Sequence, residues 1–159
     1  MGDGNGERAD NPGVVAPPPL IFAGGLAAGL LTNRLRPTPF LPRGLSRALG
    51  WPLVVAGLAL GLWGFREMRR AGTNVDPYHP TTAIVDRGPY GFTRNPLYVG
   101  MTLIYSGLSA RANALPAALL LPAVLHVVDR GVVKREERYL EGKFGDEYLR
   151  YKGRVRRWI

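Results

Sequence analysis

Residues 95–128 read NPLYVGMTLIYSGLSARANALPAALLLPAVLHVV, and Arg111 is the only Asp, Glu, Lys or Arg among them. Two apolar runs, 95–110 and 112–128, therefore follow each other with a short polar connection around Asn113. A helix needs roughly 20 apolar residues to cross the hydrocarbon core of a bilayer, with about 17 as the lower bound. Because each run is at or just below this length, the stretch predicts a tight hairpin of two transmembrane helices.

Two further runs without charged residues, 11–33 and 48–65, precede this hairpin. Neither shows the polar stripe of a helix on the surface of a soluble protein. Both contain the Gly-xxx-Gly spacing that lets membrane helices approach closely, beginning at Gly25 and at Gly57. The alternative is a soluble bundle, but a chain of 159 residues has no second layer to bury four apolar helices. We therefore predict an all-α integral membrane protein with about four transmembrane helices and a C-terminal interfacial amphipathic helix.

The basic residues predict the orientation of this protein in the membrane. Four spans place both termini on one side, together with sixteen of the 21 Lys and Arg residues, and the positive-inside rule makes that side cytosolic. The opposite side would carry Arg34, Arg36, Arg43 and Arg47, which disagrees with this rule. The first span therefore either crosses the membrane fully, lies shallow in it or is re-entrant. The net charge of +9 also suggests nucleic acid, but the basic residues lie beside apolar runs. Anionic headgroups of the lipid bilayer are therefore the expected partner, and nucleic acid is not.

Cysteine and histidine are scarce in this chain. It contains no cysteine, which excludes disulfides, thiolate nucleophiles and cysteine metal sites. Only two histidines are present, His79 and His126, and the second lies inside an apolar run. We therefore predict no metal site.

Three polar segments surround the apolar runs. Residues 1–19 are rich in Gly, Asn and Pro and predict a disordered tail, which leaves 20–159 as one domain. The loop 69–94 is too long for a simple connector. Its Pro, Gly and Thr residues predict a turn-rich path with free backbone groups, which either bind a polar cofactor or are solvated. Residues 129–159 predict a helix leaving the membrane, whose apolar face is formed by Leu140, Phe144, Tyr148 and Tyr151.

Two motifs on either side of the hairpin carry a resemblance to a known family. The first reads GPYGFTRNPLYVG at 88–100, and the second comprises REERYL at 135–140 and FGDEYLRYK at 144–152. In order and spacing, residues 66–158 resemble the isoprenylcysteine carboxyl methyltransferases and phospholipid methyltransferases. The resemblance implies a bacterial-type methyltransferase of the inner membrane that uses S-adenosylmethionine without a Rossmann domain. The absence of a Gly-x-Gly-x-x-Gly turn after a strand agrees with this.

The resemblance also implies the position of the cofactor site, within residues 70–159. There the cofactor lies between the last two spans, the preceding loop and the C-terminal helix. Arg94 and Asn95 are the candidate catalytic residues. The implied cofactor-binding residues come from the loop, from the start of the third span and from the acidic pair of the second motif, and they are Thr82, Ala83, Ile84, Val85, Tyr90, Asn95, Pro96, Leu97, Tyr98, Glu136 and Glu137.

The chemistry of these side chains suits the cofactor, although each has a plainer interpretation. A sulfonium cation requires a carboxylate such as Glu136, and the ribose and amino acid ends require hydroxyl and amide groups. Arg94 lies either near the cofactor carboxylate or at the membrane edge as a basic anchor. Tyr90 and Tyr98 are also typical of an interfacial aromatic belt, and the acidic pair is also compatible with exposed surface charge.

Two departures from the family pattern bear on the acceptor. Animal and yeast prenylcysteine enzymes have His where this chain has Asn95, and they have an Arg one turn before the Glu, where this chain has Val132 or Val133. These departures favour a lipid, a quinone-like compound or another hydrophobic acceptor, lipidated or small, that enters from the bilayer. The alternatives are a non-catalytic membrane scaffold or lipid-interacting protein on the same fold, and a nicotinamide-dependent reductase of the related sterol-reductase-like fold.

Overall fold

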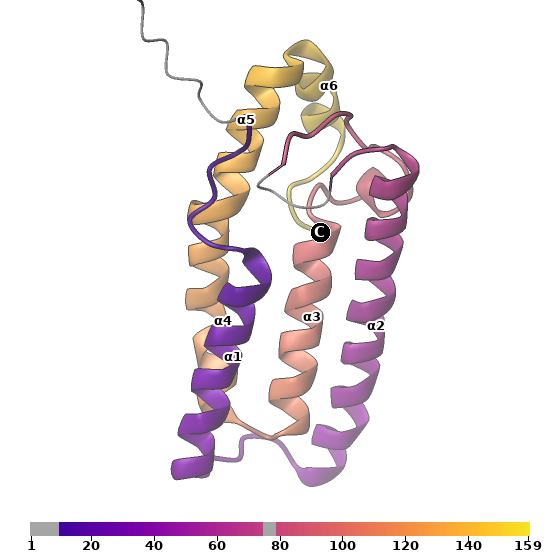
Figure 1. The fold of residues 1–159 in the computed structure, drawn as a ribbon. Coiled ribbons are helices and arrows are strands. Elements are labelled where there is room, and N and C mark those ends of the chain that lie inside the picture. Colours follow the sequence, from indigo (N-terminus) through magenta and orange to yellow (C-terminus); the bar gives the residue numbers. More distant parts are fainter. Residues whose placement is uncertain (1–9, 75–78) are drawn as a thin grey trace, which may run out of the picture.

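The computed structural model describes residues 10–74 and 79–159, and within these ranges it contains helices and no strand. Four long helices lie side by side with alternating direction, and the two shorter C-terminal helices close one end of the bundle (Figure 1). In chain order the elements are α1 (Pro18–Leu35), α2 (Arg43–Arg70), η1 (Gly88–Gly91), α3 (Pro96–Arg111), α4 (Leu115–Val128), η2 (Asp129–Val133), α5 (Lys134–Phe144) and α6 (Asp146–Arg154).

Among the described residues, two helices are long and apolar enough to cross a membrane, Arg43–Arg70 and Leu115–Phe144. The second is a continuous helix formed by α4, the π-helical turn η2 and α5, and its run without charged residues ends at Val128. The other two bundle helices are shorter, with 18 residues in α1 and 16 in α3. The predicted all-α fold is thus confirmed for the described residues, whereas four complete crossings remain a prediction.

The bundle consists of two helix pairs, α1 with α4 and α2 with α3 (Figure 1). The predicted hairpin connection is a tight turn in which Asn113 adopts a positive φ of 50°. Its side chain joins this turn to the neighbouring α1–α2 loop, because Oδ1 accepts hydrogen bonds from the amides of Phe40 and Leu41 at 2.9 Å each. The end of the bundle opposite α5 and α6 is therefore held by hydrogen bonds between a side chain of one loop and the backbone of the other.

Glycines mark the close approach of α2 and α3. A Cβ atom at Gly57 would lie 2.5 Å from the carbonyl oxygen of Gly100 and 2.8 Å from Cγ1 of Ile104. Further along the pair, a Cβ atom at Gly107 would lie 2.6 Å from the carbonyl oxygen of Gly50. The helices therefore touch through their backbones, as small residues permit between membrane helices.

Replacing Gly57 by alanine is expected to destabilise the protein by roughly 1–3 kcal/mol, because the added methyl group overpacks the α2–α3 contact. Gly61→Ala is the matched control on the same helix, since a Cβ there meets no atom within 4 Å. The measurement is the unfolding midpoint of both variants in detergent. Equal losses of stability in the two variants would contradict the assigned contact.

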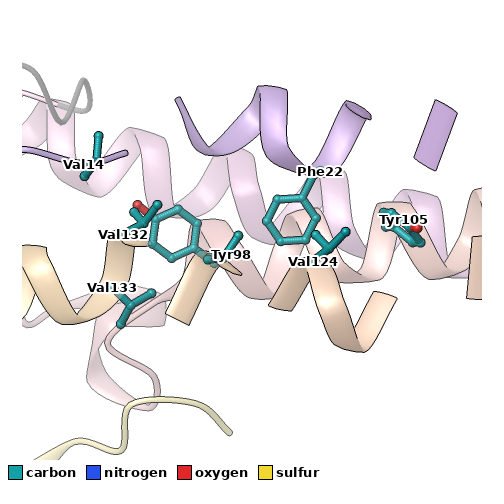
Figure 2. Close-up of a cluster of buried hydrophobic side chains, with 8 residues drawn as sticks. Val14, Phe22, Tyr98, Tyr105, Val124, Val132 and Val133 are labelled. Carbon is teal, nitrogen blue, oxygen red and sulfur yellow. The ribbon is translucent and has the colours of Figure 1, made fainter. Parts of the chain in front are cut away.

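A cluster of buried apolar side chains joins the two helix pairs. Figure 2 shows Tyr98 of α3 beside Val132 and Val133 of the π-helical turn, with Phe22 and Val124 further along the same cluster. Tyr105 lies deeper in α3, and its hydroxyl donates a hydrogen bond to the carbonyl oxygen of Ala117 at 2.9 Å. This core fixes α3 against the helix that carries the acidic pair.

The N-terminal segment, residues 10–17, is held against this core and against α5. Val14 is buried in the cluster of Figure 2, and the amide of Val15 donates a hydrogen bond to the carbonyl oxygen of Gly131 at 3.2 Å. Asp10 forms an ion pair with Lys143 at 2.7 Å. The composition predicts disorder for 1–19, whereas residues 10–17 make tertiary contacts because α5 offers them a charged partner and η2 offers them a backbone partner. Residues 1–9 lie outside the described part of the chain.

The C-terminal region differs from the single helix predicted for 129–159. The helix ends at Phe144, and Gly145 adopts a positive φ of 51°, which glycine accommodates without steric cost. The following α6 therefore changes direction and packs back, so that Leu140 and Phe144 still meet Tyr148 and Tyr151 in one apolar cluster. The four residues share a face as predicted, but they do so across a turn.

Candidate active site

An open cavity lies at the end of the bundle that carries both C-terminal helices. Its empty volume, which includes the open solvent at its mouth, is about 900 Å³. The walls come from the loop before α3, the first turn of α3, α5 and α6. The sequence-predicted site residues that line it are Ala83, Ile84, Val85, Tyr90, Arg94, Asn95, Pro96, Leu97, Tyr98, Glu136 and Glu137.

Thr82 is the predicted site residue that does not line the cavity. Its hydroxyl donates a hydrogen bond to the carbonyl oxygen of Gly72 at 2.9 Å, and its amide donates one to Thr73 Oγ1 at 3.1 Å. Thr73, one of these partners, itself lines the cavity. Thr82 therefore supports the cavity wall through Thr73 without forming part of the wall.

The one-turn helix η1 brings Tyr90 to the cavity. Gly88 begins this turn with a positive φ of 57° and packs closely on Glu67 and Trp63 of α2. At its other end, the hydroxyl of Tyr151 donates a hydrogen bond to the carbonyl oxygen of Tyr90 at 2.9 Å. Burial raises the pKa of Tyr90 well above its usual range, so its phenol stays a neutral hydrogen-bonding group.

Glu136 projects from α5 into the cavity, beyond the apolar part of its helix. The hydroxyl of Tyr98 donates a hydrogen bond to its Oε1 at 2.7 Å. No lysine or arginine of the described chain lies within ion-pair distance of this carboxylate. Burial raises the pKa of Glu136 to about 7, the Tyr98 hydrogen bond opposes that rise, and the charge of Glu137 adds to it. A cavity with such a carboxylate is suited to a cationic ligand.

Glu137 has the opposite environment, although it is the next residue. Arg157 binds both of its carboxylate oxygens, at 2.8 Å through Nε and 2.7 Å through Nη2. Arg94 donates from Nη2 to the same carboxylate at 2.8 Å. Burial alone would raise the pKa of Glu137, but the hydrogen bonds of Arg157 and the nearby positive charges lower it below its usual value. Its charge is already compensated within the protein.

Arg94 connects this ion pair to the cavity wall. Its side chain is only 8% exposed, and its Nη1 donates a hydrogen bond to the carbonyl oxygen of Lys152 at 3.0 Å. The buried Nε has no hydrogen-bond partner among the described residues. A buried donor without a partner costs free energy, so this group is available to an acceptor atom of a ligand.

Asn95 is held at the beginning of α3. Its side-chain amide donates a hydrogen bond to the carbonyl oxygen of Arg157 at 2.9 Å, and its backbone amide bonds to Thr93 Oγ1 at 3.2 Å. Pro96 follows as the first residue of the helix, where its missing amide costs nothing. Arg94 and Asn95, the two candidate catalytic residues, thus both contact the C-terminal end of the chain.

Several residues at this site were not predicted from the sequence. Arg157 and the cavity-lining Pro12, Tyr139, Tyr148 and Tyr151 belong to segments that composition assigned to lipid contact, a disordered tail or an amphipathic face. The available signal was the tyrosine hydroxyl itself, which usually needs a polar partner when it is buried. Tyr139 donates to Asp10 Oδ1 at 2.7 Å, and Tyr151 donates to the carbonyl oxygen of Tyr90 at 2.9 Å. Arg157 lies in a basic C-terminal sequence, whose charge predicts contact with lipid headgroups and does not indicate a specific ion pair with Glu137.

Comparison with known proteins identifies the family to which this chain belongs. A sequence profile described as phospholipid methyltransferase matches residues 45–147, from α2 to the beginning of α6. A Haemophilus influenzae protein described as uncharacterized is 61% identical over 33 residues, which are 21% of this chain and 52% of that protein. The chain therefore spans about half the length of the curated relative that it matches. No solved structure matches it. Since the profile covers most of the chain, the protein belongs to the phospholipid methyltransferase family.

Proposed function

We propose that this protein transfers a methyl group from S-adenosylmethionine to a hydrophobic acceptor that reaches the site from the bilayer. The observation that carries the proposal is the Glu136 carboxylate, which faces an open cavity and has no cationic partner in the described chain. A carboxylate removed from water without a counter-charge is costly, and a cationic ligand offsets that cost. A family of methyltransferases makes a sulfonium the appropriate cation.

The other cavity residues fit the remaining parts of this cofactor. The unpartnered Nε of Arg94 suits the carboxylate of an amino acid, and Tyr90 offers a phenol for a polar contact. Apolar side chains such as Leu97 and Leu140 suit a flat base. When bound, S-adenosylmethionine supplies a methyl group activated by a positively charged sulfur. The protein's residues then hold the reactants in position and exclude water from them.

The membrane arrangement supports a lipid-soluble acceptor. We propose that all four bundle helices are embedded and that the cavity end faces the cytosol, in the inner membrane of a bacterium. The cavity end carries Asp10, where the described part of the chain begins, together with the C-terminus and most of the basic residues, as the positive-inside rule requires. Exposed apolar side chains along the bundle, including Leu31, Val55 and Leu119, are suited to contact with lipid tails. An acceptor dissolved in the bilayer can therefore approach the cavity without crossing water.

Thermal stabilisation of the purified protein tests the proposed cofactor. In detergent, S-adenosylmethionine at about 100 times its dissociation constant is expected to stabilise the folded state by roughly 2.7 kcal/mol, because it binds the folded state alone. NADPH serves as the control, since a reductase of a related membrane fold would bind it instead. Stabilisation by NADPH and none by S-adenosylmethionine would refute the proposed function.

A second experiment, with a labelled methyl group, identifies the acceptor. Incubation of the enzyme with methyl-labelled cofactor and membranes is expected to transfer label to a fraction that extracts with lipid. A non-catalytic scaffold would bind membranes without any transfer of label. Label confined to water-soluble material would contradict an acceptor from the bilayer.

A further inference from the structure

The C-terminal segment, residues 155–158, packs on the turn that precedes α3. The carbonyl oxygen of Arg156 accepts a hydrogen bond from the amide of Arg94 at 2.9 Å, and Val155 is buried against Tyr148 and Tyr151. Trp158 packs on the apolar cluster of Figure 2. This segment lies beyond the residues matched by the family profile, which end at 147.

Within this segment, Arg157 contributes both its backbone and its side chain. Its carbonyl oxygen accepts hydrogen bonds from Asn95 Nδ2 at 2.9 Å and Thr93 Oγ1 at 3.3 Å. Its guanidinium binds both oxygens of Glu137, and its Nη1 lies 3.7 Å from Asp129 Oδ1. Such a two-point contact fixes orientation as well as charge, which a lysine does not achieve.

The geometry points to Arg157 as a positioning residue for the cofactor site. The Arg157 guanidinium holds the Glu137 carboxylate and so fixes the rotation of the first turns of α5. Glu136 then faces the cavity as the carboxylate of the pair that has no arginine or lysine partner in the described chain. This inference rests on the proposed function, because it concerns the affinity of the same cavity for a sulfonium cation. Arg157 itself is absent from the cavity wall, so it acts through Glu137.

An electrostatic consequence distinguishes this role from general stabilisation. The groups around Glu136 are Tyr98 of α3, Tyr90 of η1, Tyr148 of α6 and Glu137 of its own helix. Among them, Glu137 is the one that raises the pKa of Glu136 by its negative charge. Removing the Arg157 charge leaves Glu137 less compensated, so Glu136 should ionise at higher pH.

The experiment measures the affinities of the full-length protein for S-adenosylmethionine and S-adenosylhomocysteine between about pH 5.5 and 8.5, a range that brackets the Glu136 midpoint near 7. Their ratio isolates the sulfonium charge, because both ligands share the other ionisable groups. For Arg157→Gln we expect the midpoint of this ratio to move upward by roughly 0.5–1 unit. At pH 7 the loss of sulfonium binding is then about two- to fivefold. Arg156→Gln is the matched control, because Arg156 has an exposed side chain and carries the same charge.

Arg157→Lys separates charge from geometry and also serves if the glutamine variant does not fold. We expect it to keep the wild-type midpoint, because the charge is retained, but to bind more weakly at high pH, because an ammonium cannot hold both oxygens of Glu137. Wild-type affinity and midpoint in either variant would overturn the inference, as would equal shifts in Arg156→Gln. A wild-type protein that binds neither ligand would instead refute the proposed function.

Discussion

Replacing Glu136 by glutamine is expected to weaken the binding of S-adenosylmethionine by roughly 10- to 150-fold, equivalent to about 1.5–3 kcal/mol for the lost contact with a charged group. The fold should be unaffected, because the glutamine side chain retains an oxygen that can accept the Tyr98 hydrogen bond. Affinity measured by calorimetry in detergent checks the first expectation, and the unfolding midpoint checks the second. Wild-type affinity in the variant would show that the carboxylate does not bind the sulfonium.

The matched control for this variant is Glu147→Gln, which removes the same charge at an exposed position of α6. S-adenosylhomocysteine provides a second control, because its sulfur is uncharged and its affinity should fall less. The pH dependence has a definite sign. Because the pKa of Glu136 is raised to about 7, the carboxyl group is about half ionised at pH 7. The preference for the sulfonium should therefore be greatest about one unit or more above pH 7, and it should decrease as the pH falls through 7 and the carboxylate is protonated. The glutamine variant should show no such pH dependence.

Replacing Glu137 by glutamine is expected to have the opposite outcome, with loss of stability before any specific loss of binding. The change removes the negative charge that compensates Arg94, whose side chain is 8% exposed, and Arg157. Breaking a buried ion pair by removing one partner costs roughly 3–5 kcal/mol, because the remaining charge stays buried without compensation. For a domain of this size, the unfolding midpoint should fall by roughly 10 °C.

Glu136→Gln is the natural control for this second variant, because the chemical change is identical and the two positions are adjacent. The measurement compares unfolding midpoints and cofactor affinities of both proteins in the same detergent. If the Glu137→Gln protein were as stable as wild type but failed to bind S-adenosylmethionine, the roles assigned to the two residues would be reversed. Equal destabilisation of both variants would contradict the division of roles.

Much of the fold follows from the distribution of charge along the sequence. Long runs without charge become helices, because a backbone that lies in apolar surroundings must satisfy its hydrogen bonds internally. The helix boundaries in the structure agree with the predicted ones where the sequence carries a local signal. The helix α3 begins at Pro96, and α3 and α4 are connected through Asn113. The family was also recognisable, since the motif at 88–100 is a local property of the chain and the profile match includes it.

The turn at Gly145 was missed for a physical reason. The apolar spacing of Leu140, Phe144 and Tyr148 continues the period of a helix, and a sharp turn between two helices leaves the same residues in contact. Periodicity therefore does not distinguish the two arrangements. In the same way, the composition of 10–17 says nothing of the partners that α5 and Gly131 provide.

The residue types that surround the cavity can be read from the local sequence. The sequence also shows an acidic pair on a helix that follows a long apolar run. The division of labour within that pair cannot be read from the sequence, because Glu136 and Glu137 have the same side chain and adjacent positions. In a helix, neighbouring side chains point in different directions, and the rotation of the helix decides which one faces Tyr98 and which one faces Arg94 and Arg157. The π-helical turn Asp129–Val133 changes the number of residues per turn just before the pair, so the rotation is set by tertiary packing around that turn.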